Sequence, residues 1–205
     1  MKYILILMAD GCEEIEALAP VDVLRRAHMN VQTVACSGSS GIITGSHNIA
    51  ITCDQLVNDA LKKIESGILP DAVVCPGGMI GSQNLAKNSV VTKILLAMHK
   101  AHKIIAANCA APVIVFAKLG LLKKKNYTCY PGMQNNFEQY APNADVGMSD
   151  AGIYKDAPAV VDGNMLTGHG PGASFVFSLK LLELLSDRQT AEKLKDGMVI
   201  MEGLV

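Results

Sequence analysis

One cysteine in the chain occupies a position that suits a nucleophile. The apolar run Lys103–Ala107 predicts a buried strand that ends at Asn108, and Pro112 has the fixed φ of a first-turn helical residue. Cys109 therefore stands at the sharp corner between a strand and a helix, an arrangement called a nucleophile elbow when the residue is serine. Amides of the first helical turn would stabilise a negative sulfur and lower the thiol pKa below about 8.5. We interpret Cys109 as reactive and the other five cysteines as small buried hydrophobic residues.

A glycine pair follows a second predicted strand. Gly77 and Gly78 come directly after Pro76, at the end of the apolar run Ala72–Cys75. Paired glycines at a strand end let backbone N–H groups approach a ligand closely, so this loop could supply an oxyanion hole beside the cysteine. A tight strand-to-helix connection explains the glycines equally well. The glycine patterns of nucleotide-binding loops are absent from the sequence, and we expect no cofactor.

Acidic residues open the first predicted helix. Glu13, Glu14 and Glu16 share one turn, where they would favour the positive end of the helix dipole, and that role alone could explain all three. Glu16, however, has apolar neighbours and could point inward toward Cys109. A carboxyl group that is protonated by burial could donate a hydrogen bond to a thiolate there.

Two of the five histidines could act as the partner that a nucleophilic cysteine commonly has. His47 lies in a glycine-punctuated segment, and His169 lies in the tight loop that leads into the last helix. A structural or solvated role is the more common one for a lone loop histidine, and both alternatives stay open. No His, Cys or acidic pair shows the spacing of metal ligands, so the sequence predicts no metal site.

The elements that would position these residues alternate along the chain. Apolar runs predict strands at Tyr3–Met8, Val31–Cys36, Ala72–Cys75 and Lys103–Ala107. Helical periodicity predicts helices at Glu13–Ala27, Val57–Ser66, Val90–His102, Ala110–Leu119 and Ala173–Leu185. Such alternation is typical of a mostly parallel sheet with right-handed crossovers, and it predicts a three-layer α/β/α sandwich.

Other segments interrupt this alternation. Pro20 lies inside the first helix and should kink it or mark a restart. The segment Ser37–Thr52 predicts a small β excursion from the main sheet. The irregular region Cys129–Met165 is expected to hold a short helix at Met133–Tyr140 and strands near Val146 and Ala159.

Chain length, net charge and cysteine distribution argue against several classes of protein, including nucleic-acid-binding and membrane proteins. The 205 residues suit a single domain spanning 1–205, and the net charge of -1 gives no positive field to attract nucleic acid. The apolar run at residues 3–9 is too short to cross a membrane and lacks a signal cleavage pattern. Six dispersed cysteines without a C-x-x-C pair favour a reducing compartment, so we expect a cytoplasmic protein without membrane or nucleic-acid partners.

Five segments together resemble the ThiJ/PfpI superfamily, in particular its parkinsonism-associated deglycase branch. They are Gly11–Ala17, Pro20–Ala27, Pro76–Gly78, Ala106–Pro112 and Gly170–Phe175, in the family's order and across nearly the whole chain. The resemblance implies a flavodoxin-like fold, usually dimeric, in which Cys109 is the reactive cysteine and Glu16 is hydrogen-bonded to it. It also implies that the amides of Gly78 and Ala110 line an oxyanion site.

The resemblance implies a cofactor-independent enzyme of the glutathione-independent glyoxalase or deglycase type, acting on small reactive carbonyls or on glycated thiols and amines. The rival hypotheses are a redox-sensing stress chaperone that uses oxidation of Cys109, and a cysteine peptidase or amidase. Tyr130 stands where many relatives carry a histidine before Pro131, which weakens the peptidase hypothesis. His169 is the candidate substitute for that histidine.

Overall fold

A single seven-stranded sheet forms the middle layer of the computed structural model, which describes residues 1–140 and 152–200. Its strand order is β10-β11-β7-β6-β1-β2-β5, and every neighbouring pair is parallel except β10 with β11. The strands are β1 (Tyr3–Met8), β2 (Asn30–Ala35), β5 (Gln55–Leu56), β6 (Ala72–Cys75), β7 (Ile104–Asn108), β10 (Ala159–Asp162) and β11 (Met165–Gly168).

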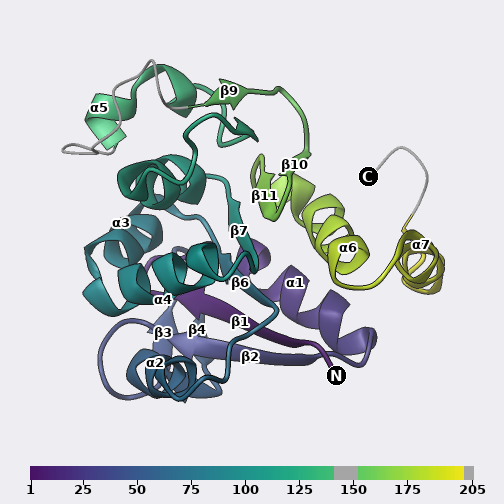
Figure 1. Ribbon diagram of the computed structural model, residues 1–205, viewed down its shortest axis with the longest axis horizontal. Coiled ribbons are helices and arrows are strands. Elements are labelled where there is room, and N and C mark those ends of the chain that lie inside the picture. The colour runs from purple at the N-terminus through teal and green to yellow at the C-terminus, as the bar shows by residue number, and fades with distance from the viewer. Residues whose placement is uncertain (141–151, 201–205) are drawn as a thin grey trace.

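Helices cover both faces of this sheet, as Figure 1 shows. One face packs against α1 (Glu14–Arg26) and α6 (Ser174–Leu185), and α7 (Arg188–Gly197) packs on α6. The other packs against α2 (Val57–Glu65), α3 (Met79–Lys87) and α4 (Ser89–Lys100). Successive side chains of β1 point to opposite faces of the sheet, so this strand contributes to both hydrophobic cores. Leu5 and Leu7 belong to one core, and Ile4 and Ile6 belong to the other. The expected three-layer α/β/α sandwich is confirmed.

The predicted bounds of most elements are close to the observed ones. The strands expected at Tyr3–Met8 and Ala72–Cys75 are found with those bounds. The first helix does not restart at Pro20, since α1 runs through this residue without a break. The helix expected at Ala110–Leu119 is instead a π-helix, η1 (Pro112–Phe116), followed by a 3₁₀ turn, η2 (Ala117–Leu119). A π-helical turn of this kind is rare and frequently marks a functional site.

The β excursion is confirmed as a hairpin of β3 (Ile42–Thr44) and β4 (Ala50–Thr52). The irregular region Cys129–Met165 holds two short elements, η3 (Met133–Asn135) and α5 (Phe137–Tyr140), in place of the single helix expected at Met133–Tyr140. Its strand β9 (Ile153–Tyr154) pairs in parallel with β8 (Asn126–Tyr127), and a 3₁₀ turn, η5 (Pro171–Ala173), precedes α6. The strand expected near Ala159 is β10, whereas the one expected near Val146 lies outside the described residues. Sequence patterns did not predict α3, α7 or β11.

This arrangement places three loops at one edge of the sheet. Strands β1, β6 and β7 are neighbours and parallel, so their carboxyl ends meet at the same edge, where open α/β sheets bind ligands. The loops after them lead to α1, to α3 and to η1. The candidate residues of all three motifs therefore converge.

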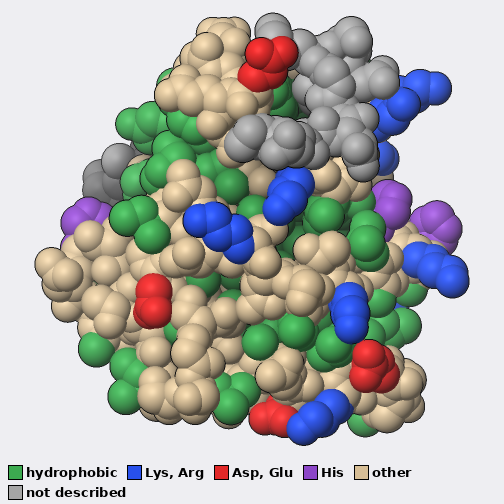
Figure 2. Space-filling view, turned by 90° about the vertical axis from the view of Figure 1, so that its left-hand side faces the viewer, with side chains coloured by type: hydrophobic (Ala, Val, Ile, Leu, Met, Phe, Trp, Pro, Cys, Tyr) green, Lys and Arg blue, Asp and Glu red, His purple; other side chains and the backbone are tan. Residues whose placement is uncertain are grey.

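The surface carries little concentrated charge on the face shown in Figure 2. Lys, Arg, Asp and Glu side chains are scattered there among apolar and neutral ones, on the part that the structure describes. No helix among the described residues combines the length and apolar character that a membrane crossing requires.

Candidate active site

Cys109 occupies a strained corner directly after β7. Its φ is +59°, in the left-handed region that non-glycine residues seldom adopt. Two backbone hydrogen bonds hold the corner: the Cys109 N–H donates to the carbonyl of Gly168 (2.9 Å), and the Cys109 carbonyl accepts from the N–H of Tyr130 (2.7 Å). Cys109 thus lies between the end of β7 and η1, at the corner that the sequence predicted, and it is only 8% exposed.

The amides expected to form an oxyanion site lie beside the sulfur. The backbone N–H groups of Gly78 and Ala110 interact with the Cys109 thiol and act to lower its pKa. Gly78 is the N-cap residue before α3 and has a φ of +82°, a conformation that glycine adopts at little cost. One amide comes from the loop after β6 and the other from the segment after β7, and these are the two amides that the family resemblance implies.

The backbone N–H of Gly77, which was expected to face an oxyanion, binds the Glu16 carboxyl group instead. This N–H donates to Oε2 of Glu16 at 2.7 Å, so this amide holds the acid rather than an oxyanion. A Cβ atom at this position would lie 2.5 Å from Glu16 Oε2 and 2.6 Å from Cys109 Cβ. The absence of a side chain at Gly77 therefore lets the carboxyl group and the cysteine come together. Sequence reasoning missed this role because a glycine pair does not reveal which amide faces which ligand.

Glu16 is completely buried on α1 and faces Cys109. Its backbone N–H is capped by Oε2 of Glu13 at 2.7 Å, which explains one of the neighbouring acids as an N-cap. The Oε1 atom of Glu16 has no hydrogen-bonding N or O partner among the described residues. Burial raises the pKa of Glu16 to about 7, although hydrogen bonds from Gly77 and Cys109 act to lower it.

The thiol pKa does not follow the sequence-based expectation. Burial, together with the charge of Glu16 and the hydrogen bond to it, raises the pKa of Cys109, and the amides of Gly78 and Ala110 lower it less than these effects raise it. The sequence analysis missed two features of the site. The acid that faces the sulfur repels a negative charge on it, and the helix expected to stabilise that charge by its dipole is only a short π-helix. A thiolate here therefore requires a proton on Glu16, and the two groups titrate as a coupled pair.

Tyr130 and His169 border a pocket of about 490 Å³ beside the corner. The pocket is also lined by Asp156 and by the residues at 170–173. His169 Nδ1 lies 3.3 Å from the Thr128 hydroxyl, and the Tyr130 amide is bonded to the Cys109 carbonyl. Among residues 1–140 and 152–200, no histidine forms a hydrogen bond with Cys109.

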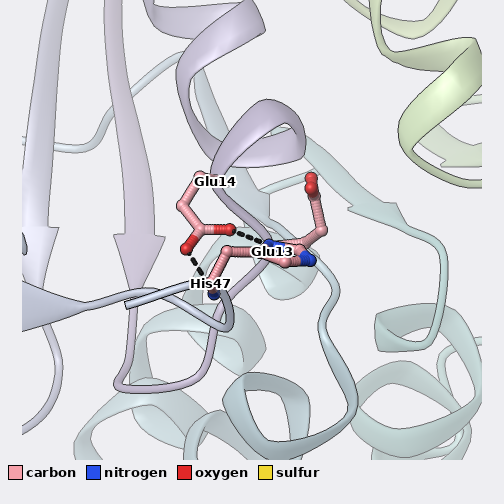
Figure 3. A group of neighbouring side chains, drawn as sticks. All are labelled: Glu13, Glu14 and His47. Carbon is pink, nitrogen blue, oxygen red and sulfur yellow. Dashed lines mark hydrogen bonds and ion pairs between the residues drawn. The ribbon is translucent and has the colours of Figure 1, made fainter. Parts of the chain in front are cut away.

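His47 does not enter this pocket, and pairs instead with Glu14 (Figure 3). Its Nδ1 lies 2.6 Å from Glu14 Oε2, and its backbone N–H donates to Oε1 at 2.7 Å. Hydrogen bonding to Glu14 raises the pKa of His47. Burial acts to raise the pKa of Glu14, but the His47 hydrogen bonds outweigh it and lower that pKa to about 2.

The fold and the site together define an α/β protein with a cysteine elbow, a facing buried acid and converging backbone amides. Residues 2–184 match the model of the DJ-1/PfpI family, and the chain belongs to this family. The match confirms the resemblance to the ThiJ/PfpI superfamily.

Individual relatives cover the chain almost completely. The Parkinson disease protein 7 homolog of Danio rerio is 31% identical over 201 residues, 98% of each protein. A crystal structure of a cysteine-to-alanine mutant of a DJ-1 superfamily protein from Salmonella typhimurium is 34% identical, with a TM-score of 0.83 over 97% of this chain and 98% of that one.

Of two further relatives, one is much longer than this chain and the other is named for an enzymatic activity. The chain spans only 41% of the DJ-1 homolog B of Arabidopsis thaliana, to which it is 32% identical over 96% of its own length. It is 26% identical over 192 residues to the glutathione-independent glyoxalase DJ-1 of Schizosaccharomyces pombe, covering 92% of this chain and 93% of that protein.

Proposed function

We propose that the protein is a cofactor-independent enzyme that converts small reactive carbonyls to hydroxy acids, with Cys109 as nucleophile and Glu16 as acid and base. The observation that carries this proposal is a nearly buried sulfur that faces a carboxyl group whose pKa is raised to about 7. A group that titrates near neutral pH can both give and accept a proton during turnover. The relative from Schizosaccharomyces pombe, which is named a glutathione-independent glyoxalase, supports the same chemistry.

The proposed reaction needs no oxidant. The Cys109 thiolate attacks the aldehyde carbon of methylglyoxal, and the carbonyl oxygen takes the proton of Glu16, which gives a hemithioacetal. The Glu16 carboxylate then removes the hydrogen of that carbon and returns it to the neighbouring carbonyl carbon, while the hydroxyl proton passes to the second oxygen. Water hydrolyses the resulting thioester, which releases lactate and a proton and regenerates the cysteine. Hemithioacetals and aminocarbinols on thiols and amines would enter the same sequence.

Lactate formation from methylglyoxal without glutathione tests the proposal. Purified protein should produce lactate, and Cys109→Ser should lower kcat/KM at least roughly 100-fold because the nucleophile is lost. Cys53→Ser is the matched control, since this partly buried cysteine lies on the hairpin side of the sheet and outside the site. Equal slow rates for wild type and Cys109→Ser would refute the proposal.

A redox-sensing role is a second candidate that the same geometry supports. The amides of Gly78 and Ala110 and the carboxyl of Glu16 surround the sulfur with groups that could bond to sulfinate oxygens. Mild peroxide should then add two oxygens to Cys109 before any other cysteine, as measured by mass spectrometry. Oxidation spread evenly over the six cysteines would contradict this role.

The peptidase or amidase alternative receives no such support. A protease of this type needs a histidine paired with the cysteine. Position 130 is a tyrosine, and the two candidate histidines bond elsewhere: His169 to Thr128, and His47 to Glu14. We therefore favour carbonyl chemistry over amide hydrolysis.

We also infer that the protein acts as a homodimer. Exposed apolar side chains gather on the first helix and on the hairpin that contacts its beginning: Ile15 and Leu18 on α1, with Ile42 and Ile49 on the β3–β4 hairpin. Backbone bonds from Gly11 to Thr44 and from Ser46 to Cys12 join these two segments. Burial of such a surface against a second copy would remove it from water.

A further inference from the structure

Two carboxyl groups and an imidazole meet outside the cysteine site, where the hairpin contacts the beginning of α1 (Figure 3). Glu13 and Glu14 come from the helix start, and His47 comes from the loop between β3 and β4. One donor atom of each side chain lies within 4.8 Å of the others. Sequence spacing could not reveal this set, because His47 lies more than thirty residues from the two acids.

The contacts within the set are short and directed. Both oxygens of Glu14 bond to residue 47, one to the ring and one to the backbone amide, and the Ser46 hydroxyl lies 3.2 Å from Glu14 Oε2. The Glu14 carboxylate is thus fixed in place and aimed at the imidazole. Glu13 uses its Oε2 to cap the Glu16 N–H, which leaves its Oε1 for another partner.

Negative charge in this region has little compensation. Glu13, Glu14 and Glu16 are at most 9% exposed. In the described part of the chain no Lys or Arg forms an ion pair with any of the three, and His47 is the single basic partner. Burial of a carboxylate is costly unless a cation, hydrogen bonds or protonation compensates it. The helix dipole supplies about half a positive charge at this end, less than two carboxylates carry.

We propose that Glu13, Glu14 and His47 bind one divalent transition-metal ion, for which Zn²⁺ is the best match. Zinc accepts imidazole nitrogen and carboxylate oxygen at about 2.0–2.2 Å, whereas Mg²⁺ and Ca²⁺ prefer oxygen alone. The His47 side chain is 68% exposed, so its ring can turn toward the carboxylates and draw the donors to the roughly 3.4 Å separation of a tetrahedral ion. Water would complete the coordination, and the ion would replace the proton shared by His47 and Glu14.

Calorimetric titration with ZnCl₂ tests the site, using tag-free protein treated with a chelator and then dialysed at neutral pH. We expect one Zn²⁺ per chain, and excess Mg²⁺ should not compete. His47→Ala should weaken binding at least roughly tenfold, because a ligand is lost. His99→Ala, which removes an exposed histidine of α4, should bind zinc as the wild type does. His47→Gln provides a second variant that keeps a hydrogen bond to Glu14.

Thiol binding must be separated from this site. Cys109→Ser should keep the same zinc stoichiometry and affinity, and X-ray absorption should show nitrogen and oxygen neighbours without sulfur. The proposal is overturned if no zinc binds, if His47→Ala and His47→Gln bind it as tightly as the wild type, or if the absorption spectrum shows zinc–sulfur distances. None of these readouts depends on the proposed carbonyl chemistry.

Discussion

At the scale of single residues, Glu16 and Cys109 compete for protons in one buried space. Burial raises the pKa of both groups. Glu16 disfavours the charged form of Cys109, whereas the hydrogen bond from Cys109 favours the charged form of Glu16. A reactive sulfur is therefore not a free thiolate but one member of a pair that exchanges a proton. This is why the pKa of Glu16, and not that of Cys109 alone, sets the pH range in which the site can work.

The Glu16 carboxyl makes folding stability depend on pH. Its pKa rises from 4.5 in the unfolded reference to about 7 in the folded protein, so its contribution is complete below pH 4.5 and is lost as pH rises through 7. Glu16→Gln, which keeps an acceptor for the Gly77 amide, should remove this dependence. Between these limits wild type should lose about 3 kcal/mol more unfolding free energy than the variant, measured by urea denaturation.

Asp22→Asn is the matched control for this measurement. Asp22 lies on the same helix, in an exposed i,i+4 pair with Arg26, and should leave the pH profile close to that of wild type. Parallel profiles for wild type and Glu16→Gln would show that the carboxyl is not perturbed.

Gly77 lets the side chains of Glu16 and Cys109 approach each other because it has no side chain of its own. Gly77→Ala should cost about 1–3 kcal/mol in unfolding free energy, because the new methyl group would overlap Glu16 Oε2 and Cys109 Cβ. Lactate formation should fall as well, since the pair is forced apart. Gly197→Ala has open space around the added carbon and should lower neither quantity. An active, stable Gly77→Ala protein would contradict the assigned geometry.

At the scale of elements, the sequence predicted the strands that carry the site better than the loops and turns between them. Continuous aliphatic runs define β1 and β6 because both faces of these strands are buried. Strand β11 is short and contains Thr167 and Gly168, so its pattern carries no strong strand signal. The turn after Cys109 has the composition of an α-helix, and only tertiary packing selects the π-helical form.

The same contrast holds within the candidate site. Cys109 and Glu16 could be proposed from local motifs, because each stands at the start of a helical segment after a strand. The His47–Glu14 pair could not, because their contact depends on how the hairpin folds back onto α1. Side chains that meet only through tertiary structure leave no periodic signal in the sequence.

Helix α6 supports the strand that holds the cysteine corner. Phe177 is fully buried beside Gly168, the residue whose carbonyl bonds to the Cys109 amide. Phe177→Ala should therefore lower the unfolding free energy by about 3–5 kcal/mol. Phe175→Ala, in the same helix but 42% exposed, should cost less than about 1 kcal/mol. Equal losses in urea denaturation would show that α6 does not pack as described.

At the scale of the whole molecule, the apolar surface on α1 and the hairpin predicts self-association. Ile49→Lys should shift the protein from dimer to monomer in sedimentation velocity, because a charge would be buried in the interface. Ile68→Lys changes a comparably exposed isoleucine outside this surface and should leave the dimer intact. A wild-type protein that sediments as a monomer at micromolar concentration would contradict the inference.

The crossover connections have a kinetic consequence. Glu16, Gly77 and Cys109 are 61 and 32 residues apart, and they meet only when β1, β6 and β7 lie side by side in register. Closing such long loops is slow compared with forming local helices. Refolding chains should therefore regain far-ultraviolet ellipticity before they regain lactate formation. Activity during refolding would then report only the molecules in which β1, β6 and β7 have paired.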